Sequence, residues 1–182
     1  MISEPIKKIL DEVLDREGWP AYTDGTTGAS KHDRGGPTKG GITLRTLESW
    51  RQRRVTRREL KALSRDEALR ILFRRFVEVQ GIYRIKNPIL QEQVIDNSVH
   101  SGPVTAVKDL QRAVGVKADG IIGSITLSAI ESKARGSATG ETELCNQVAI
   151  TRAIRLADFV QHHPEQLVFL EGWMRRILSF IR

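Results

Sequence analysis

The sequence has a single cysteine, Cys145, among its 182 residues, so no disulfide can form within the chain. Its neighbours Leu144 and Val148 continue a helical apolar pattern, which is typical of a small core residue rather than a nucleophile. No apolar run approaches the roughly eighteen residues that a membrane-spanning helix needs. Acidic residues interrupt the N-terminal segment where a signal peptide needs a continuous apolar stretch, so we expect a protein made and folded in the cytoplasm.

Histidine is also scarce. The four histidines lie at positions 32, 100, 162 and 163, and none has the spacing of a zinc-binding motif with another potential ligand. The sequence likewise lacks the G-x-S-x-G element of serine hydrolases and the glycine-rich phosphate loop of nucleotide-binding proteins. We therefore expect no metal site and no cofactor, which disfavours a zinc amidase or peptidase.

Positive charge is unevenly distributed along the chain. The formal net charge is +7, and residues 1–90 carry it, mostly within Arg51–Arg75, whereas the charges of residues 91–182 balance. A basic surface of this kind predicts an anionic partner, which is a nucleic acid, an anionic membrane or a polyanionic cell wall. A solvated helical face is the alternative interpretation.

Apolar residues recur at helical spacing through most of the chain, and strand signals are limited to at most a small hairpin within residues 20–43. We expect Trp50 and Trp173 to pack in the core, because both lie on apolar helical stripes. The sequence predicts a mainly α fold with a small β or irregular lobe, divided at residues 1–87 and 88–182 or integrated into one domain. The expected helices cover residues 3–17, 44–50, 64–77, 88–101, 104–114, a segment through 127–130, 141–161 and 164–181. Thr56 with Glu59 and Ser64 with Glu67 have the spacing of a capping box at a helix start.

The stretch from Glu17 to Thr43 interrupts this helical pattern. It reads EGWPAYTDGTTGASKHDRGGPTKGGIT and contains seven glycines but almost no apolar residues. A segment of this length inside a compact chain exceeds an ordinary connection and is typically functional or disordered. Its aromatic, acidic and threonine residues favour function.

Two carboxylates near a helix end suit glycoside hydrolysis, in which one acid protonates the leaving oxygen and a second group assists water or stabilises charge. Glu17 ends the first helix, and Asp33 is its natural partner. Thr38 has a hydroxyl that can hold a water molecule. The remaining expected substrate contacts include aromatic rings for stacking on sugars and glycine for close approach, and they are Trp19, Tyr22, Asp24, Gly36, Lys39 and Asn97.

The elements EGWPAYTD and DRGGPTKGGIT resemble the signature of the glycoside hydrolase family 108 muramidases, a lysozyme-like group found in phage endolysins and related bacterial lysins. The stretch VIDNSVHSGPVTAVKDLQRAVGVKADGIIGSITLSAI is similar to the family's C-terminal predicted peptidoglycan-binding region, and EGWMRRIL resembles its closing segment. The resemblance covers roughly residues 5–180. It implies a lysozyme-like α+β fold and a monomeric enzyme that cleaves the β-1,4 bond between N-acetylmuramic acid and N-acetylglucosamine.

Carried over by position, the resemblance makes Glu17 the general acid, with Asp33 and Thr38 positioning water or stabilising charge. It also implies action on the cell wall after release through a holin or a secretion system. Departures from the family pattern are Trp19 for a glycine, Gly40 for a tyrosine, and the inserted residues TTGASKH, which leave the choice between Asp33 and Asp24 open.

Several alternatives remain at the level of the sequence. A lytic transglycosylase needs only the glutamate, and a wall-binding protein or a basic nucleic-acid binder needs no catalysis at all. The predicted partners are therefore peptidoglycan and, through Arg51–Arg75, an anionic envelope surface, with no nucleic acid expected. The landmark at Asp119, Gly120, Gly123 and Thr126 is interpreted as a structural turn before a helix rather than as a binding site.

Overall fold

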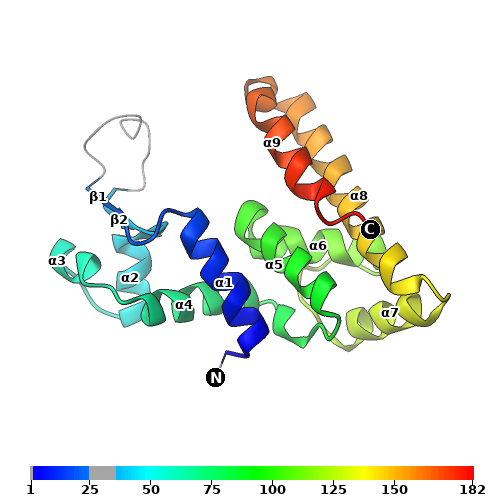
Figure 1. Ribbon diagram of the computed structural model, residues 1–182, viewed down its shortest axis with the longest axis horizontal. Helices are drawn as coiled ribbons and strands as arrows, with labels where there is room; N and C mark the ends of the chain where they lie inside the picture. The colour runs from blue at the N-terminus through cyan, green and yellow to red at the C-terminus, as the bar shows by residue number, and fades with distance from the viewer. Residues whose placement is uncertain (1, 25–35) are drawn as a thin grey trace. The chain divides into compact units, whose positions relative to one another are not determined.

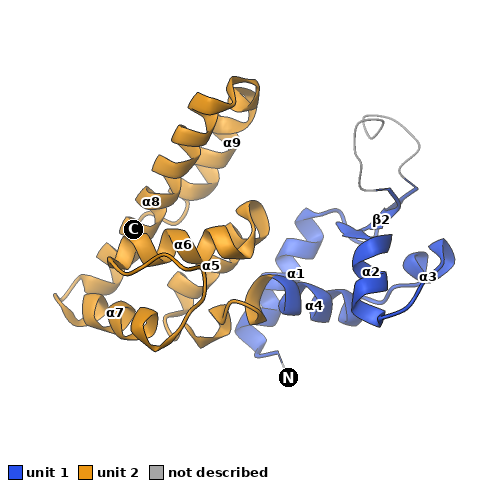
Figure 2. Ribbon diagram, turned by 180° about the vertical axis from the view of Figure 1, so that it is seen from behind, with its two compact units in different colours: residues 1–75 blue, residues 76–182 orange. Residues whose placement is uncertain are grey.

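The computed structural model describes residues 2–24 and 36–182 and divides into two compact units, Met1–Arg75 and Phe76–Arg182 (Figures 1 and 2). This contact boundary precedes residue 87, where the sequence predicted a division. The reason lies in the connection after residue 78, which is tied into the second unit. Ile122 N donates to Gln80 O at 2.9 Å, and the buried Gln91 amide donates to Ile85 O at 2.8 Å.

The first unit combines helices with a small antiparallel sheet of order β1-β2-β3 (Figure 1). The mainly α class with a small β lobe is confirmed. Its elements are α1 (Glu4–Arg16), β1 (Tyr22–Thr23), β2 (Thr38–Lys39), β3 (Ile42–Thr43), α2 (Leu44–Arg51), α3 (Arg57–Lys61) and α4 (Arg65–Phe73), after which the π-helical turn η2 (Arg74–Glu78) leads into the second unit.

Helix α1 forms because four apolar residues at helical spacing become one buried face, namely Ile6, Leu10, Val13 and Leu14. The helix ends where Gly18 adopts φ +79°, a left-handed conformation that glycine tolerates best. Helix α1 packs on α4. Arg65 at the start of α4 forms ion pairs with two residues of α1, with Arg65 Nε 2.6 Å from Asp11 Oδ1 and Arg65 Nη1 2.8 Å from Asp15 Oδ1.

Side-chain caps begin three helices of the first unit. Thr43 Oγ1 accepts from Thr46 N at 3.1 Å, and Thr56 forms the predicted capping box with Glu59. Ser64 Oγ likewise accepts from Glu67 N. The Glu67 carboxylate, however, pairs with Arg51 at 2.7 Å, because a charge-assisted pair outcompetes the return bond of a capping box.

The second unit is entirely helical in its regular structure (Figure 2). Helix α9 runs beside α8, and Ala149, Leu156 and Ile177 form a core cluster between them. No helix within the described ranges is long and apolar enough to cross a membrane. The elements are η3 (Ile82–Arg84), α5 (Pro88–Ser101), α6 (Pro103–Val114), α7 (Ser124–Arg135), α8 (Gly140–His162), η4 (Pro164–Gln166) and α9 (Leu167–Leu178).

The turn before α7 is organised around the buried side chain of Gln111. Its amide nitrogen donates to Asp119 Oδ1 at 2.7 Å and to Thr126 Oγ1 at 3.1 Å, and its oxygen accepts from Gly120 N at 2.8 Å. Gly120 adopts φ +88°, and a Cβ there would lie 2.8 Å from Val104 Cγ1. These contacts support the interpretation of this landmark as a structural turn.

A buried ion-pair network links α5, α8 and α9. Arg152, which is 1% exposed, donates to Asp96 Oδ2 at 2.8 Å, and Arg176 Nη2 lies 2.6 Å from Asp96 Oδ1. Burial acts to raise the pKa of Asp96, but hydrogen bonds and charge from Arg176 and Arg152 hold it below its usual value. The Nε and Nη2 atoms of Arg152 have no hydrogen-bond partner among the described residues.

We predict that Asp96→Ala lowers the free energy of unfolding by about 3–5 kcal/mol, because it leaves buried positive charge unpaired. Arg152→Met costs less, since Asp96 keeps Arg176 and two unpartnered polar atoms disappear. Urea unfolding of both variants measures the difference. An Arg152→Met loss equal to or larger than that of Asp96→Ala contradicts this account.

His100, near the C-terminus of α5, makes stability depend on pH. Burial and the charges of Arg152 and Arg176 lower the pKa of His100 to about 4, and its ring lies edge-on to Trp173 at 5.5 Å between centroids. The unfolded chain binds this proton below pH of about 6.5, whereas the native state does not until about pH 4. Native stability is therefore lost as pH falls through that window.

We predict that His100→Gln reduces this pH dependence, because glutamine has no proton to bind. Urea unfolding at pH 7.5, 6, 5 and 4.5 compares the wild type with the variant. The stability difference between them should shift in favour of the variant as pH falls. Parallel pH profiles rule out a contribution from His100.

Candidate functional site

Glu17 lies at the C-terminal end of α1, as the sequence predicted, and its side chain meets the turn between β2 and β3. A Cβ placed on Gly41 would lie 3.1 Å from Glu17 Oε2 and 3.6 Å from Glu17 Cδ, and Gly41 adopts φ +76°. Glu17 is exposed, and no described residue makes a hydrogen bond or ion pair with its carboxylate. The carboxyl group is thus placed against backbone while staying accessible to a ligand.

Trp19 packs on the neighbouring glycine of the same turn. A Cβ on Gly40 would lie 2.6 Å from Trp19 Cε3, a distance that no real Cβ tolerates. On the ring of Trp19 lies the Lys39 ammonium, 4.8 Å from the ring centroid, which is a cation–π contact. Lys39 Nζ also donates to Lys61 O at 2.6 Å and Leu63 O at 2.8 Å. These contacts join the end of α1, the hairpin and the C-terminal end of α3 with the residues just after it.

The sheet sorts the predicted residues onto two faces, because directly opposed residues share a face. Tyr22, Lys39 and Ile42 occupy one face, and Ile42 is buried. The opposite face carries a row of hydroxyls from Thr23, Thr38 and Thr43, one from each strand. Thr38 is half-buried within this row, beside the cap of α2.

Of the two competing carboxylates, Asp24 is described and follows β1 directly, where it is half-buried. Asp33 lies outside the described residues. Gly36 is the first described residue of the second limb and adopts φ +64°. Among residues 2–24 and 36–182, no three histidine, cysteine, aspartate or glutamate side chains gather into a group that could hold a metal ion.

Asn97, expected among the substrate contacts, lies instead in the core of the second unit. It is 2% exposed, its Nδ2 donates to Asp109 Oδ2 at 3.0 Å, and its Oδ1 accepts from Arg155. The Asn97 amide thus donates to the buried carboxylate of Asp109, so Asn97 is not part of the candidate site. Sequence position on an apolar helix face did not distinguish a residue of a cleft from a residue of a buried network.

Within the basic stretch Arg51–Arg75, several arginines form ion pairs with glutamates, and Arg74 and Arg75 line a cavity. Arg51 pairs with Glu67 at 2.7 Å and Arg53 with Glu59 at 2.6 Å, and Arg53 is the main cause that lowers the pKa of Glu59 to about 2. Acidic partners therefore neutralise part of the positive charge that the sequence predicted for this face. The arginines lining a cavity beside α2 belong to a different environment.

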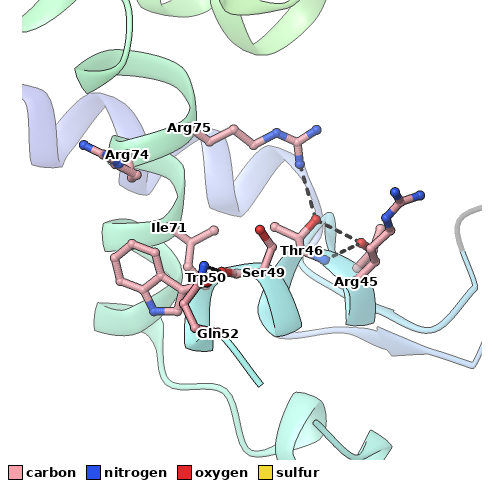
Figure 3. Close-up of a pocket in the computed structure, with 9 residues that line it drawn as sticks. Arg45, Thr46, Ser49, Trp50, Gln52, Ile71, Arg74 and Arg75 are labelled. Atoms are coloured by element: carbon pink, nitrogen blue, oxygen red, sulfur yellow. Dashed lines mark hydrogen bonds between the residues drawn. The ribbon is translucent and has the colours of Figure 1, made fainter. Parts of the chain in front are cut away.

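That cavity was not predicted from the sequence. It has a volume of about 730 Å³ and lies between α2 and the end of α4 (Figure 3). Trp50, expected in the core, is 37% exposed and forms part of the cavity wall. The available signal was the placement of Arg74 and Arg75 off the apolar stripe of their helix.

An accessible carboxyl group beside a glycine-rich turn, on a mainly α fold with a small β lobe, fits the general acid of a lysozyme-like glycoside hydrolase. The comparisons with known proteins agree with that class. The family described as Glycosyl hydrolase 108 matches residues 10–102, and the Predicted Peptidoglycan domain matches residues 105–178. The chain belongs to glycosyl hydrolase family 108 and is a glycoside hydrolase of peptidoglycan.

Among solved structures, that of Brucella abortus SagA is similar to this chain. The two are 31% identical, and the match covers 96% of this chain and 90% of that one with a TM-score of 0.70. A comparison with the curated proteins found no match. The similarity to SagA extends over both compact units.

The packing of Trp19 on Gly40 explains the two departures from the family pattern together. The pattern has glycine at position 19 and tyrosine at position 40, so the large and small residues have exchanged places. We predict that Gly40→Tyr alone lowers the free energy of unfolding by about 1–3 kcal/mol, because it adds a side chain at positive φ and displaces the Trp19 ring.

The Trp19→Gly/Gly40→Tyr double variant should recover part of that loss, since the space occupied by the indole becomes free. A double-mutant cycle by urea unfolding measures the coupling between the two positions. Additive effects of the two single substitutions contradict a shared space.

Proposed function

We propose that the chain is an N-acetylmuramidase that cleaves the β-1,4 bond between N-acetylmuramic acid and N-acetylglucosamine, with Glu17 as the general acid. The observation that carries this proposal is the contact of the Glu17 carboxyl group with Gly41. Because Gly41 lacks a side chain, the Glu17 carboxyl group lies directly against the turn and keeps its other side exposed to a glycan. Trp19, half-buried beside the acid, offers a ring on which a sugar stacks.

In this mechanism protonated Glu17 donates its proton to the glycosidic oxygen as the bond from C1 to that oxygen breaks. Water adds to C1 and loses a proton to the second carboxylate, for which Asp33 and Asp24 are the candidates. Thr38 holds this water with its hydroxyl, on the face where Thr23 and Thr43 supply further hydroxyl groups. Tyr22 and Gly36 complete the proposed contacts along the hairpin.

Lys39 has a positioning role in this proposal, although the sequence placed it among the substrate contacts. Its ammonium donates to two backbone carbonyls and covers the Trp19 ring. The lysine therefore fixes the ring beside Glu17 and the turn that bears Gly41.

The second unit is proposed to hold peptidoglycan while the first unit cleaves it. The family likeness of residues 105–178 to a peptidoglycan domain supports this division of labour. The role that the family resemblance implies, a phage endolysin that reaches the wall through a holin or a secretion system, is part of this proposal.

We predict that Glu17→Gln lowers the rate of peptidoglycan hydrolysis by about 10²–10⁴-fold, because glutamine cannot donate the proton. Release of reducing ends from purified peptidoglycan measures the rate. Glu12→Gln is the matched control, since it removes one exposed carboxylate from the same helix outside the proposed site. Equal rates for Glu17→Gln and the control would sink the assignment of the acid.

Mass spectrometry of the products separates hydrolysis from lytic transglycosylation. A muramidase releases a reducing N-acetylmuramic acid, whereas a transglycosylase releases an anhydro product that lacks one water. Anhydro products alone contradict the proposed hydrolysis but leave Glu17 as the acid.

A further inference from the structure

Rings from three segments of the second unit form an aromatic cluster that the proposed hydrolysis does not use. Its members are His100 near the end of α5, Phe159 of α8, His163 just after α8, and Phe169 and Trp173 of α9. The centroid of the Trp173 ring lies 5.5 Å from that of His100, 6.4 Å from that of Phe159 and 6.0 Å from that of Phe169. The Phe159 and His163 centroids are 4.5 Å apart. Each ring therefore neighbours another, and together they make a continuous aromatic surface.

The aromatic cluster is supported on one side and open on the other. Trp173 packs against the core cluster between α8 and α9, which holds its ring in place. Phe159 is 39% exposed and Phe169 is 53% exposed. Helices α8 and α9 lie side by side and extend beyond α5 and α6 (Figures 1 and 2). Exposed aromatic side chains gathered on a packed support are typical of a binding surface.

The charges around the aromatic cluster indicate which kind of ligand it takes. Arg155 and Arg176 both pair with buried aspartates. Burial and the arginine charges lower the pKa of His100 to about 4, so its ring is uncharged in neutral solution. Glu165, between α8 and α9, is exposed and adds negative charge. An uncharged ligand therefore suits this surface better than an acidic peptide or an anionic membrane does.

We propose that the aromatic cluster binds the glycan of peptidoglycan by stacking sugar rings on Phe159 and Phe169. The inference rests on the proposed function and assigns a binding surface within the unit that is proposed to hold peptidoglycan. The face of a sugar ring carries C–H groups, which pack on the electronegative face of an aromatic ring. The exposed imidazole of His163 adds a hydrogen-bonding group at the edge of the cluster.

The three tryptophans of the chain allow the test to follow separate sites in one titration. Trp19 lies in the proposed catalytic site, Trp50 lines the cavity beside α2, and Trp173 belongs to the aromatic cluster. Each has one indole N–H, whose nuclear magnetic resonance signal is assigned with Trp→Phe variants. The ligand is a hexasaccharide of N-acetylglucosamine, an uncharged glycan without a stem peptide. The full chain carries Glu17→Gln as the reference background, so that the ligand stays intact.

We expect the Trp173 signal to shift as the hexasaccharide is added. In the Phe159→Ala/Phe169→Ala variant of this background, the Kd read from that shift should rise about tenfold, the order expected from losing two aromatic contacts. The Ile154→Ala/Val168→Ala variant is the matched control, because it removes two more exposed apolar side chains from the same two helices outside the cluster. Its Kd should equal that of the reference.

A Trp173 signal that the hexasaccharide leaves unchanged overturns the proposal, as does an equal rise of Kd in the control. A response of Trp173 only to phosphatidylglycerol vesicles, or only to protein concentration, identifies a membrane or a second copy as the occupant and also overturns it. Circular dichroism and urea unfolding establish that both variants are folded, so a loss through misfolding is identified independently.

The Trp19 signal and the cleavage assay keep this inference separable from the proposed function. If the wild type releases no reducing ends and Trp19 does not respond, the muramidase proposal fails, whereas a response of Trp173 that the Phe159→Ala/Phe169→Ala variant weakens still supports the cluster. If Trp19 responds and Trp173 does not, the proposed catalytic site stands and the cluster proposal fails.

Discussion

The close approach of the end of α1 to the Gly40–Gly41 turn is the contact on which the site depends. Trp19 lies on Gly40 and the Glu17 carboxyl group lies on Gly41. A Cβ on Gly40 would clash with the indole, and one on Gly41 would lie 3.1 Å from Glu17 Oε2 at a positive φ that favours glycine. Lys39 stabilises this arrangement, because its ammonium donates to the carbonyl groups of Lys61 at the end of α3 and Leu63 just after it and lies over the indole ring. Because this framework is made of backbone and a packed ring, the acid is positioned without any bond to its own carboxylate.

Charge is organised differently in the two units. In the first unit, acidic partners neutralise arginines such as Arg51 and Arg65, while Arg45 and Arg75 line a cavity free of acidic lining residues. In the second unit, Asp96 binds two arginines in the core. Burial makes such pairs costly to break and gives them a structural role.

Much of the fold was predictable from local sequence signals. Apolar spacing and stop signals placed α1, α5 and α6 within a few residues of their observed ends, because these signals act over one helical turn. The capping box of Thr56 was likewise correct in full. At Ser64 only the hydrogen bond from Glu67 N to the serine hydroxyl forms, because the Glu67 carboxylate accepts hydrogen bonds from Arg51, which is distant in the sequence.

The candidate site was predictable in its residue types rather than in its contacts. Glu17 at a helix end and the glycines of the hairpin follow from the sequence and its family resemblance. Three features could not be inferred from the sequence, namely the packing of Trp19 on Gly40, the burial of Asn97 and the exposure of Trp50. Each depends on contacts between residues that are far apart in the chain, or on which face of a helix is covered by another element.

The sequence by itself therefore determined the helices, the glycine-rich interruption and the acid at its root, since these depend on local periodicity and backbone freedom. Only the tertiary structure decided which charges are paired, which aromatic rings are covered and which hydroxyl groups form a row beside Thr38. The physical reason is that burial and ion pairing depend on which side chains approach each other in space. Spacing along the chain does not specify those approaches.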